Sequence, residues 1–433
     1  MVISTALCAC TVSTPKPVNE FGAEPELPQP EQRLIPTVHV APAERWPAGS
    51  TPVPAQGLRV QRFADGLTHP RWLYVLPNGD VLVAETNAPD RPDDRKGIRG
   101  WFMKRAMTKA GAAVPSPNRL ILLRDADHDG VAEQRTIFLR GLNSPFGIAL
   151  VGHDLYVANT DALMRFEYTD GATSIEGAGT KVVDLPAGPI NHHWTKNVIA
   201  SPDGSRLYVT VGSNSNAGER GLENEHGRAA IWELSRADGR LRVFATGLRN
   251  PNGLAFEPQT GALWTVVNER DELGDRLVPD YLTSVRDGGF YGWPFVYYGD
   301  HVDPRMKDEG APAPAAVPDY ALGSHTASLG LAFNAAPDWP APFAEGAFVG
   351  QHGSWNRSEF SGYKVVFVPF RAGRPNGSIV DVLTGFISES GSASGRPVGV
   401  VTDARDGLLV ADDVGNTVWR VSPGGVRTSS LGR

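Results

Sequence analysis

The stretch VIASPDGSRLYVTVG, residues 198–212, carries the pattern that decides the fold. Two apolar runs, each the length of one short strand, flank the turn Pro202-Asp203-Gly204. Asp-Gly between apolar runs is typical of a tight hairpin, because these residues tolerate the backbone angles that such a turn requires. The stretch therefore predicts two antiparallel strands joined by a turn.

The same strand–turn–strand pattern recurs along the chain. Its six imperfect copies begin at Trp72, Phe146, Val198, Gly253, Leu329 and Val398. Outer strands, such as residues 162–166 and 417–421, follow several of the copies. A single such sheet cannot bury both of its faces, so neighbouring sheets must stack around an axis. The sequence therefore predicts an all-β fold, a six-bladed β-propeller, in preference to an array of β-sandwiches.

Length and composition agree with a globular body that has a sizeable core. The chain has 433 residues, of which 41% are hydrophobic and 21% charged. Its net charge of −7 argues against a nucleic-acid partner, which a basic excess would indicate. The 48 glycines and 35 prolines have no fixed short period and suit many short strands joined by turns.

The N-terminal segment differs from the rest of the chain. Residues 1–56 are predicted to form a leader and a Pro-rich extended linker, and residues 57–433 the propeller domain. LCAC, residues 7–10, resembles a lipoprotein cleavage box that would place a lipid on Cys10, so we expect a periplasmic or membrane-anchored protein. A disordered tail is the alternative. Cys8 and Cys10 are the only cysteines, so the body holds no disulfide and no thiolate metal site.

Residues 96–113, KGIRGWFMKRAMTKAGAA, interrupt the strand pattern. Helical spacing places Phe102, Ala106 and Ala110 on one side and the basic residues elsewhere. This predicts a short helical insertion that packs on its own domain, with contact to a membrane surface as the alternative.

Residues 125–130, DADHDG, resemble the start of a calcium-binding loop. The twelfth position of an EF-hand loop is Thr136 here instead of glutamate. An Asp-rich hairpin turn is therefore the favoured interpretation, and a structural Ca²⁺ is the alternative.

Histidines and amides precede two of the predicted inner strands, where propeller loops form the mouth of the central channel. His192 and His193 are adjacent, and adjacent residues on an extended chain face opposite ways. We therefore expect one of them to point into the mouth as a general base, with a structural histidine as the alternative. Arg249 offers a fork of donors for a carboxylate, beside the amides of Asn250 and Asn252.

Further charged residues lie at the following blade boundaries. The run VNERDE, residues 267–272, is rich in oxygen and suits a hard cation. His352 and Arg357 follow a strand of the fifth repeat, and Arg396 opens the sixth. Arg249, Arg357 and Arg396 are three arginines from three blades, and they are predicted to converge on one polyanionic ligand.

Six strings carry a family resemblance: NHHWTKN, GLRNPNGLAF, VNERDELGD, DGGFYGWP, GQHGSWNRSEFSGYKVVF and GRPVGV. They resemble the sorbosone/glucose dehydrogenase family, soluble quinoproteins that use pyrroloquinoline quinone, and the resemblance covers about residues 58–422. It implies a six-bladed propeller with the cofactor at the channel mouth. Trp194 stands where the best-studied members have glutamine, which places the chain nearer the sorbosone-type branch.

The resemblance also implies roles for single residues. His193 matches the general base that acts on the sugar hydroxyl, and Arg249 and Asn250 match the pair that contacts the quinone. His193 and Arg249 are therefore the expected catalytic residues. Asn268 falls where an amide side chain contacts the cofactor.

A second set of residues matches the family's metal and carboxylate contacts. Glu269 and Arg270 fall where backbone carbonyls hold a cofactor-bound Ca²⁺. Arg396 matches a residue that contacts a cofactor carboxylate. His352 or Arg357 matches the residue of the fifth blade that contacts the cofactor. Arginines and Ca²⁺ together would offset the charge of a quinone that carries three carboxylates.

The sequence thus predicts a quinone- and Ca²⁺-dependent dehydrogenase that oxidises an aldose sugar or sugar aldehyde. Hydride would pass to the quinone while His193 removes the hydroxyl proton, and Ca²⁺ would polarise the quinone carbonyl. The expected partners are this small molecule and an electron acceptor, and no nucleic acid. A metal-dependent sugar lactonase and a non-enzymatic propeller that binds carbohydrate or peptide are the alternatives.

Overall fold

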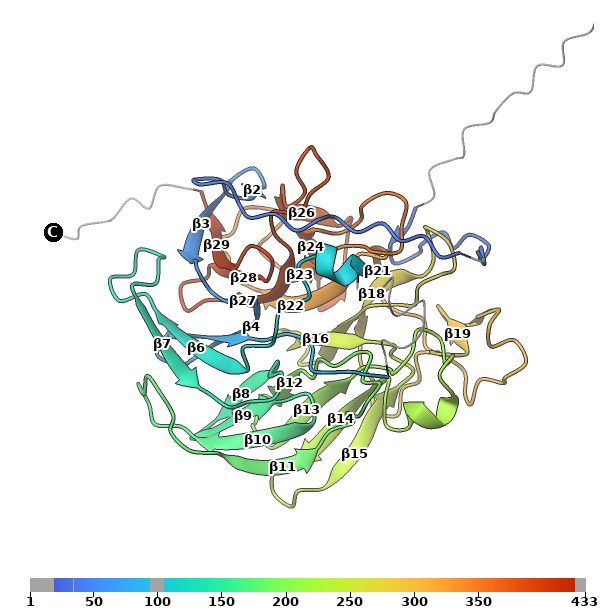
Figure 1. Cartoon of the computed structure of the whole chain (residues 1–433), viewed down its shortest axis with the longest axis horizontal. Helices are drawn as coiled ribbons and strands as arrows, with labels where there is room; N and C mark the ends of the chain where they lie inside the picture. The colour runs from blue at the N-terminus through green and yellow to red at the C-terminus, as the bar shows by residue number, and fades with distance from the viewer. Residues whose placement is uncertain (1–18, 34, 94–104, 425–433) are drawn as a thin grey trace, which may run out of the picture.

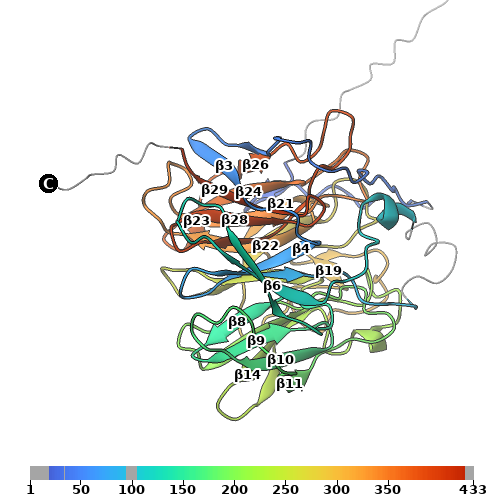
Figure 2. The same ribbon diagram turned by 60° about the vertical axis from the view of Figure 1, so that its left-hand side comes forward.

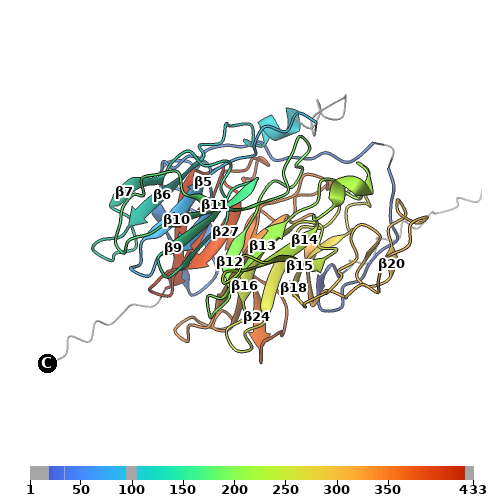
Figure 3. The same cartoon turned by 90° about the horizontal axis from the view of Figure 1, so that it is seen from below.

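The computed structural model describes residues 19–33, 35–93 and 105–424. Six antiparallel sheets are arranged around a central axis, which confirms the predicted six-bladed β-propeller (Figure 1). Seen from two further directions, the sheets remain separate layers that follow one another around the molecule (Figures 2 and 3). Among the described residues, no helix has the length and apolar character that crossing a bilayer requires.

The first three blades each contain four strands in chain order. Blade 1 consists of β4 (Pro70–Val75), β5 (Val81–Glu85), β6 (Arg119–Arg124) and β7 (Gln134–Leu139). Blade 2 consists of β8 (Ile148–Val151), β9 (Asp154–Ala158), β10 (Ala162–Glu167) and β11 (Thr180–Asp184). Blade 3 consists of β12 (Val198–Ala200), β13 (Arg206–Val211), β14 (Ala230–Ser235) and β15 (Leu241–Thr246).

The last three blades recruit strands from the N-terminal segment. Blade 4 consists of β16 (Pro251–Phe256), β17 (Leu263–Val267), β18 (Pro279–Ser284), β21 (Tyr320–Ser324) and β1 (Phe21–Gly22). Blade 5 consists of β22 (Ser328–Asn334), β23 (Gly346–Gln351), β24 (Lys364–Arg371), β26 (Val380–Thr384) and β2 (Val53–Pro54). Blade 6 consists of β27 (Pro397–Thr402), β28 (Leu408–Asp412), β29 (Thr417–Pro423) and β3 (Leu58–Ala64).

Short elements complete the fold. They are the 3₁₀-helix η1 (Leu222–Glu225) and the strands β19 (Val296–Tyr297), β20 (His301–Val302) and β25 (Arg374–Pro375). Residues 105–109 of the predicted helical insertion are helical, whereas residues 94–104 lie outside the described part of the chain. The six innermost strands β4, β8, β12, β16, β22 and β27 contact one another in that order, and β27 contacts β4, so the ring is closed.

Glycines in the innermost strands let neighbouring blades approach closely. A Cβ atom on Gly330 of β22 would lie 2.2 Å from the carbonyl oxygen of Val398 in β27. A Cβ atom on Gly147, at the start of blade 2, would lie 2.2 Å from the amide nitrogen of Val198 in β12. A side chain at either position would push two blades apart, so the recurring glycine in these strands fixes the packing around the axis.

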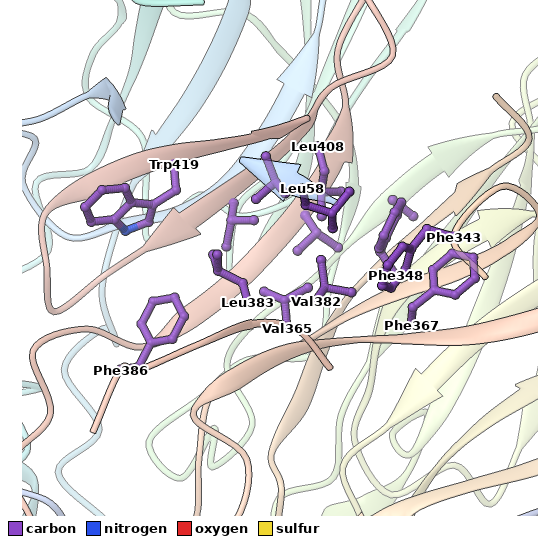
Figure 4. Packing of buried hydrophobic residues seen from close by; sticks show 14 of the residues in the cluster. Leu58, Phe343, Phe348, Val365, Phe367, Val382, Leu383, Phe386, Leu408 and Trp419 are labelled. Carbon is purple, nitrogen blue, oxygen red and sulfur yellow. The ribbon is translucent and has the colours of Figure 1, made fainter. Parts of the chain in front are cut away.

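Apolar side chains fill the space between blades, because each inner sheet buries both faces. Figure 4 shows the cluster between blades 5 and 6, where Phe348 and Phe367 lie with ring centroids 4.8 Å apart. Leu408 and Trp419 of blade 6 are fully buried against the same cluster. The described residues thus form six buried apolar clusters, one between each pair of neighbouring blades.

Residues 19–33 and 35–56, called the N-terminal strap below, run along the outside of blades 4, 5 and 6. Phe21 pairs with Leu322 at the edge of blade 4, and Val53 pairs with Thr384 at the edge of blade 5. The Nε1 atom of Trp46 donates a hydrogen bond of 2.8 Å to Asp412 in blade 6. The described part of the predicted linker is therefore extended but bound to the propeller along its length.

Candidate active site

A cavity of about 710 Å³ lies where loops between the blades meet. Five of the predicted site residues line it: His193, Arg249, Asn250, Asn268 and His352. They come from the loop before β12, the loop before β16, the end of β17 and the end of β23, so three blades contribute. The volume is in the range of about 300–1,000 Å³ that is typical of small-molecule sites.

His193 is held in one orientation by the loop after β13. Its Nδ1 atom lies 2.9 Å from the carbonyl oxygen of Ser213, and its backbone amide donates to the same oxygen. Because a carbonyl only accepts, Nδ1 carries the proton and Nε2 keeps its lone pair. Nε2 makes no hydrogen bond to any residue of the described ranges. Burial, followed by the charge of Arg249, holds the pKa of His193 well below its ordinary value of 6.5, so the ring is a neutral base.

Gly212 brings the histidine and the amide of Asn250 together. A Cβ atom at this position would lie 2.5 Å from Asn250 Oδ1 and 2.5 Å from the Cβ atom of His193. The absence of a side chain at the end of β13 thus lets the loops of blades 3 and 4 meet. Ser213 adds a second link, because its amide donates a 2.8 Å hydrogen bond to the carbonyl oxygen of Arg249.

Arg249 is buried and fixed on all three of its nitrogen atoms. Nε donates to the Asn216 carbonyl (3.1 Å), and Nη2 donates to Asn216 Oδ1 (2.9 Å) and Asp271 (3.1 Å). Nη1 donates to Asn268 Oδ1 (2.9 Å) and to the Glu269 carbonyl (2.6 Å). The guanidinium is therefore a preorganised positive group in the cavity wall, held by neighbours that keep it in place when the cavity is filled.

The side chain of Asn250 supplies an unsatisfied polar atom beside this cation. Its Oδ1 atom is buried and has no hydrogen-bond partner in the described part of the chain. An orphaned buried acceptor in a site lined by arginine indicates a ligand that brings a donor or a bound cation. The cavity, the charge of Arg249 and the free acceptor of Asn250 together fit a compact ligand that carries a negative group and also a donor or a bound cation.

The carbonyl groups predicted to hold Ca²⁺ are engaged in hydrogen bonds. Glu269 accepts one from Arg249 Nη1 (2.6 Å), and Arg270 accepts one from the amide of Val278 (3.4 Å). Neither residue lines the cavity. Because a carbonyl oxygen has two lone pairs, an ion on both carbonyls would share the Glu269 oxygen with the guanidinium of Arg249 and meet its positive charge at close range.

The side chain of Arg270 belongs to a buried network of hydrogen bonds that supports the loop after β17. It is completely buried and donates to Glu269 (2.9 Å), to Asp303 (3.2 Å) and to the Pro294 carbonyl (2.9 Å). The coulombic attraction of Glu269 and Asp303 raises the pKa of Arg270 although burial opposes it. This buried network anchors the loop after β17, which carries Asn268 at the cavity.

His352 lies in the cavity wall on a buried carboxylate. Its Nε2 atom lies 2.9 Å from Asp413 Oδ2, which also accepts a 2.6 Å hydrogen bond from Arg71. Burial lowers the pKa of His352 to about 4, so the ring is neutral and Nε2 donates to the aspartate. Sequence reasoning missed Asp413 and Arg71, which come from blades 6 and 1.

Two predicted cofactor ligands, Arg357 and Arg396, do not line the cavity. Arg357 forms an ion pair of 2.8 Å with Glu20 of the N-terminal strap. Arg396 is buried over the ring of Tyr363, 4.9 Å from its centroid, although its Nε atom has no partner among the described residues. The structure therefore brings together five of the nine predicted site residues and holds these two elsewhere.

Lys196 is a buried cation beneath the candidate base that sequence reasoning did not single out. It is fully buried, and its Nζ atom donates to the carbonyl oxygens of Trp194 (3.2 Å) and His193 (3.4 Å). Burial holds the pKa of Lys196 well below its ordinary value. The one signal for this contact in the sequence is that Lys196 lies three residues after His193. At that spacing, a turn can bring the lysine side chain back to the carbonyl groups of its own loop.

Comparison with known proteins finds a matching family profile and related sequences. The sequence profile of the TrAA12-like family matches residues 116–280 and 297–423. An uncharacterised protein of Borreliella burgdorferi is 25% identical over 304 residues, which cover 67% of this chain and 79% of that protein.

A relative with a stated activity and a solved structure also match. The pyrroloquinoline quinone-dependent pyranose dehydrogenase of Coprinopsis cinerea is 24% identical over 361 residues, which cover 73% of this chain but only 44% of that protein. The solved holo form of the quinone domain of pyranose dehydrogenase from the same fungus has a TM-score of 0.67 and 21% identity. The structural alignment covers 89% of this chain and 100% of that domain. This likeness shows that the two share a fold.

Proposed function

Because this chain belongs to the TrAA12-like family, we propose that it is a pyrroloquinoline quinone-dependent dehydrogenase that oxidises a sugar. The observation that carries the proposal is the convergence of His193, Arg249 and Asn250 on one cavity. The pyranose dehydrogenase relative and the matching quinone domain support it. An aldose or a sugar aldehyde, as in the sorbosone-type branch, is the proposed substrate class.

The cavity residues would hold the cofactor through charge and hydrogen bonds. Arg249, whose N–H groups are already donated to neighbours, would attract a carboxylate or carbonyl of the quinone through its charge, and the free Oδ1 atom of Asn250 would accept a hydrogen bond from the cofactor. His352 and Asn268, which line the same cavity, are the proposed flanking contacts. When bound, the quinone supplies the acceptor for the hydride that leaves the sugar carbon.

His193 performs the proton transfer in this proposal. Its free Nε2 atom takes the proton of the sugar hydroxyl, and the Nδ1 contact to Ser213 keeps the ring in the required tautomer. The positive charge that develops on the ring is stabilised by the dipole of the Ser213 carbonyl, which accepts the Nδ1 hydrogen bond. General-base catalysis of this kind contributes about 10²–10⁴-fold to the rate.

Calcium at the carbonyl groups of Glu269 and Arg270 is part of the proposal, with a restriction. Arg249 donates to the Glu269 carbonyl, so the ion would share that oxygen with a guanidinium whose positive charge opposes its binding. Arg357 contributes to cofactor binding only if its present contact to Glu20 is exchanged, whereas Arg396 keeps, among the described residues, a free Nε donor above the ring of Tyr363. The ion and these two arginines therefore have no role in the proton transfer by His193.

Reconstitution of the purified chain tests the proposal. The protein is loaded with pyrroloquinoline quinone, with and without Ca²⁺, and reduction of an artificial dye is followed with aldoses, polyols and aldehydes. We expect quinone-dependent dye reduction, and a loss of about 10²–10⁴-fold in kcat for His193→Gln with quinone binding retained. His226→Gln, at an exposed histidine away from the cavity, is the matched control.

Two outcomes would contradict the proposal. One is full dye reduction by His193→Gln, and the other is bound quinone without activity on any compound of the panel.

Hydrolysis of a sugar lactone with a divalent metal alone would favour the lactonase alternative. In the described ranges, the acid and histidine side chains of the cavity form no group of three or more within ligand distance of one another.

Export to the periplasm with a lipid on Cys10 is a further part of the proposal, and it concerns residues outside the described ranges. Expression of the full chain in a Gram-negative host, followed by fractionation, tests it. We expect the protein in the membrane fraction with its N-terminus at a lipid-modified Cys10, and release of the Cys10→Ser variant. Cytoplasmic protein with an unprocessed N-terminus would contradict it.

A further inference from the structure

The loop between β6 and β7 gathers four carboxylates. Asp125, Asp127, Asp129 and Glu133 each offer one carboxylate oxygen, and these oxygens all lie within 4.8 Å of one another. One oxygen of every carboxylate accepts a hydrogen bond from a backbone amide of the loop. The other oxygen of every carboxylate makes no hydrogen bond to a residue of the described ranges.

Asp125 provides an observation that is independent of this clustering. Its side chain is only 5% exposed, and its Oδ1 atom is fully buried without a hydrogen-bond partner in the described part of the chain. A buried carboxylate oxygen without a donor is costly, because it has lost its water and gained nothing in return. Such an atom on a member of this carboxylate cluster indicates a cation that is bound on the Oδ1 side of Asp125.

Within the described ranges, the ion pair of this loop is with Arg405, and it does not serve the Oδ1 atom of Asp125. Arg405 donates from the turn between β27 and β28 to Asp125 Oδ2 and to the carbonyl of His128. Four carboxylates against one guanidinium leave an excess of negative charge at a single point. Hard oxygen ligands with this spacing suit Ca²⁺, which takes six to eight of them in flexible geometry, better than Mg²⁺, which requires a strict octahedron.

The loop also lies at the point where the ring closes. Gln61 of β3 donates a 3.0 Å hydrogen bond to the carbonyl of Asp129, and Arg405 reaches the loop from the same blade. Blade 6, which contains both residues, is completed by the N-terminal strand β3 and lies beside blade 1 (Figure 1). An ion here would stiffen the contact between the first blade and the blade that closes the ring.

We propose that the loop of residues 125–133 binds one calcium ion that stabilises the contact between blades 1 and 6. Asp125, Asp127, Asp129 and Glu133 supply the carboxylate ligands. The loop does not line the cavity, so this site is separate from any cofactor-bound ion and independent of the proposed function.

Calorimetric titration and thermal unfolding of the metal-free, quinone-free chain test the site. We expect one Ca²⁺ to bind per chain through this loop, and the unfolding midpoint to rise by about 3–5 °C at 100-fold excess over Kd. The double variant Asp127→Asn/Asp129→Asn should lose both the binding of Ca²⁺ and the Ca²⁺-dependent rise in the unfolding midpoint. Asp238→Asn, which changes an exposed turn aspartate that caps the Arg240 amide in blade 3, is the matched control and should keep them.

The behaviour without calcium separates the loss of a site from misfolding. In EGTA the double variant should unfold at the temperature of the wild type or above it, because two repelling charges are gone. A calcium-dependent rise that persists in the double variant would place the ion elsewhere and overturn the proposal. So would a wild-type chain that binds no calcium, or a double variant that is already destabilised in EGTA.

Discussion

At the scale of single residues, the chemistry of the cavity depends on a histidine that is neutral before any substrate binds. The Nδ1 atom of His193 faces a carbonyl, and its environment combines burial with the nearby charges of Arg249 and His192. All three lower its pKa. The residue is therefore ready to accept a proton at neutral pH without first having to lose one.

This assignment predicts the titration of His193 in the cofactor-free protein. Histidine-labelled ¹⁵N NMR, assigned with His193→Gln, should show the Nδ1-protonated tautomer from pH 7.5 down to well below pH 6.5. Because the folded pKa lies below the unfolded value, only the unfolded chain takes up this proton just below pH 6.5. The contribution of His193 to stability is thus complete above pH 6.5 and is lost as the pH falls toward its folded pKa. A His193 signal that titrates at pH 6.5 or above would contradict the assignment.

At the scale of elements, the innermost strands set the distance between blades. Gly330 of β22 faces the backbone of β27, and a backbone oxygen cannot turn aside as a flexible side chain can. Gly330→Ala should therefore lower the free energy of unfolding by about 1–3 kcal/mol or more. Urea unfolding measures the change. Gly310→Ala is the matched control, because a Cβ atom there meets nothing within 4 Å, and equal stability of the two variants would refute the argument.

The elements were predictable from sequence to the extent that their signals are local. Turns such as residues 202–204 and the apolar runs beside them mark hairpins, so the six blades follow from the chain alone. The loops that flank inner strands also follow, so the sequence predicts that His193, Arg249 and Asn250 lie at one mouth of the channel. These predictions depend on residues that are neighbours in the sequence.

Contacts across long stretches of sequence could not be predicted in this way. Arg357 pairs with Glu20 across 337 positions, because the N-terminal strap docks on the propeller, and Arg396 lies over Tyr363 of another blade. Both arginines lie at blade boundaries in the sequence, as Arg249 does. Only the residues that they contact in the folded protein distinguish them from Arg249. The burial of Lys196 is equally invisible, since a charged residue before a strand is ordinarily exposed.

At the scale of the whole molecule, closure of the ring determines where the site lies. The strand β3 comes from the N-terminal side of the chain and completes blade 6, so both ends of the propeller domain meet in one sheet. Closure holds loops from different blades at fixed distances around the axis. The cavity is therefore a property of the complete ring, and an isolated blade would not contain it.

The central claim is that loops of different blades form one binding site for a redox cofactor beside a histidine base. The crystal structure of the chain saturated with pyrroloquinoline quinone and Ca²⁺ tests this most directly. We predict that the quinone occupies the cavity, in contact with Arg249 and Asn250 and within reach of His193 Nε2. A quinone bound on another face, or a cavity that stays empty at saturating quinone, would contradict the claim.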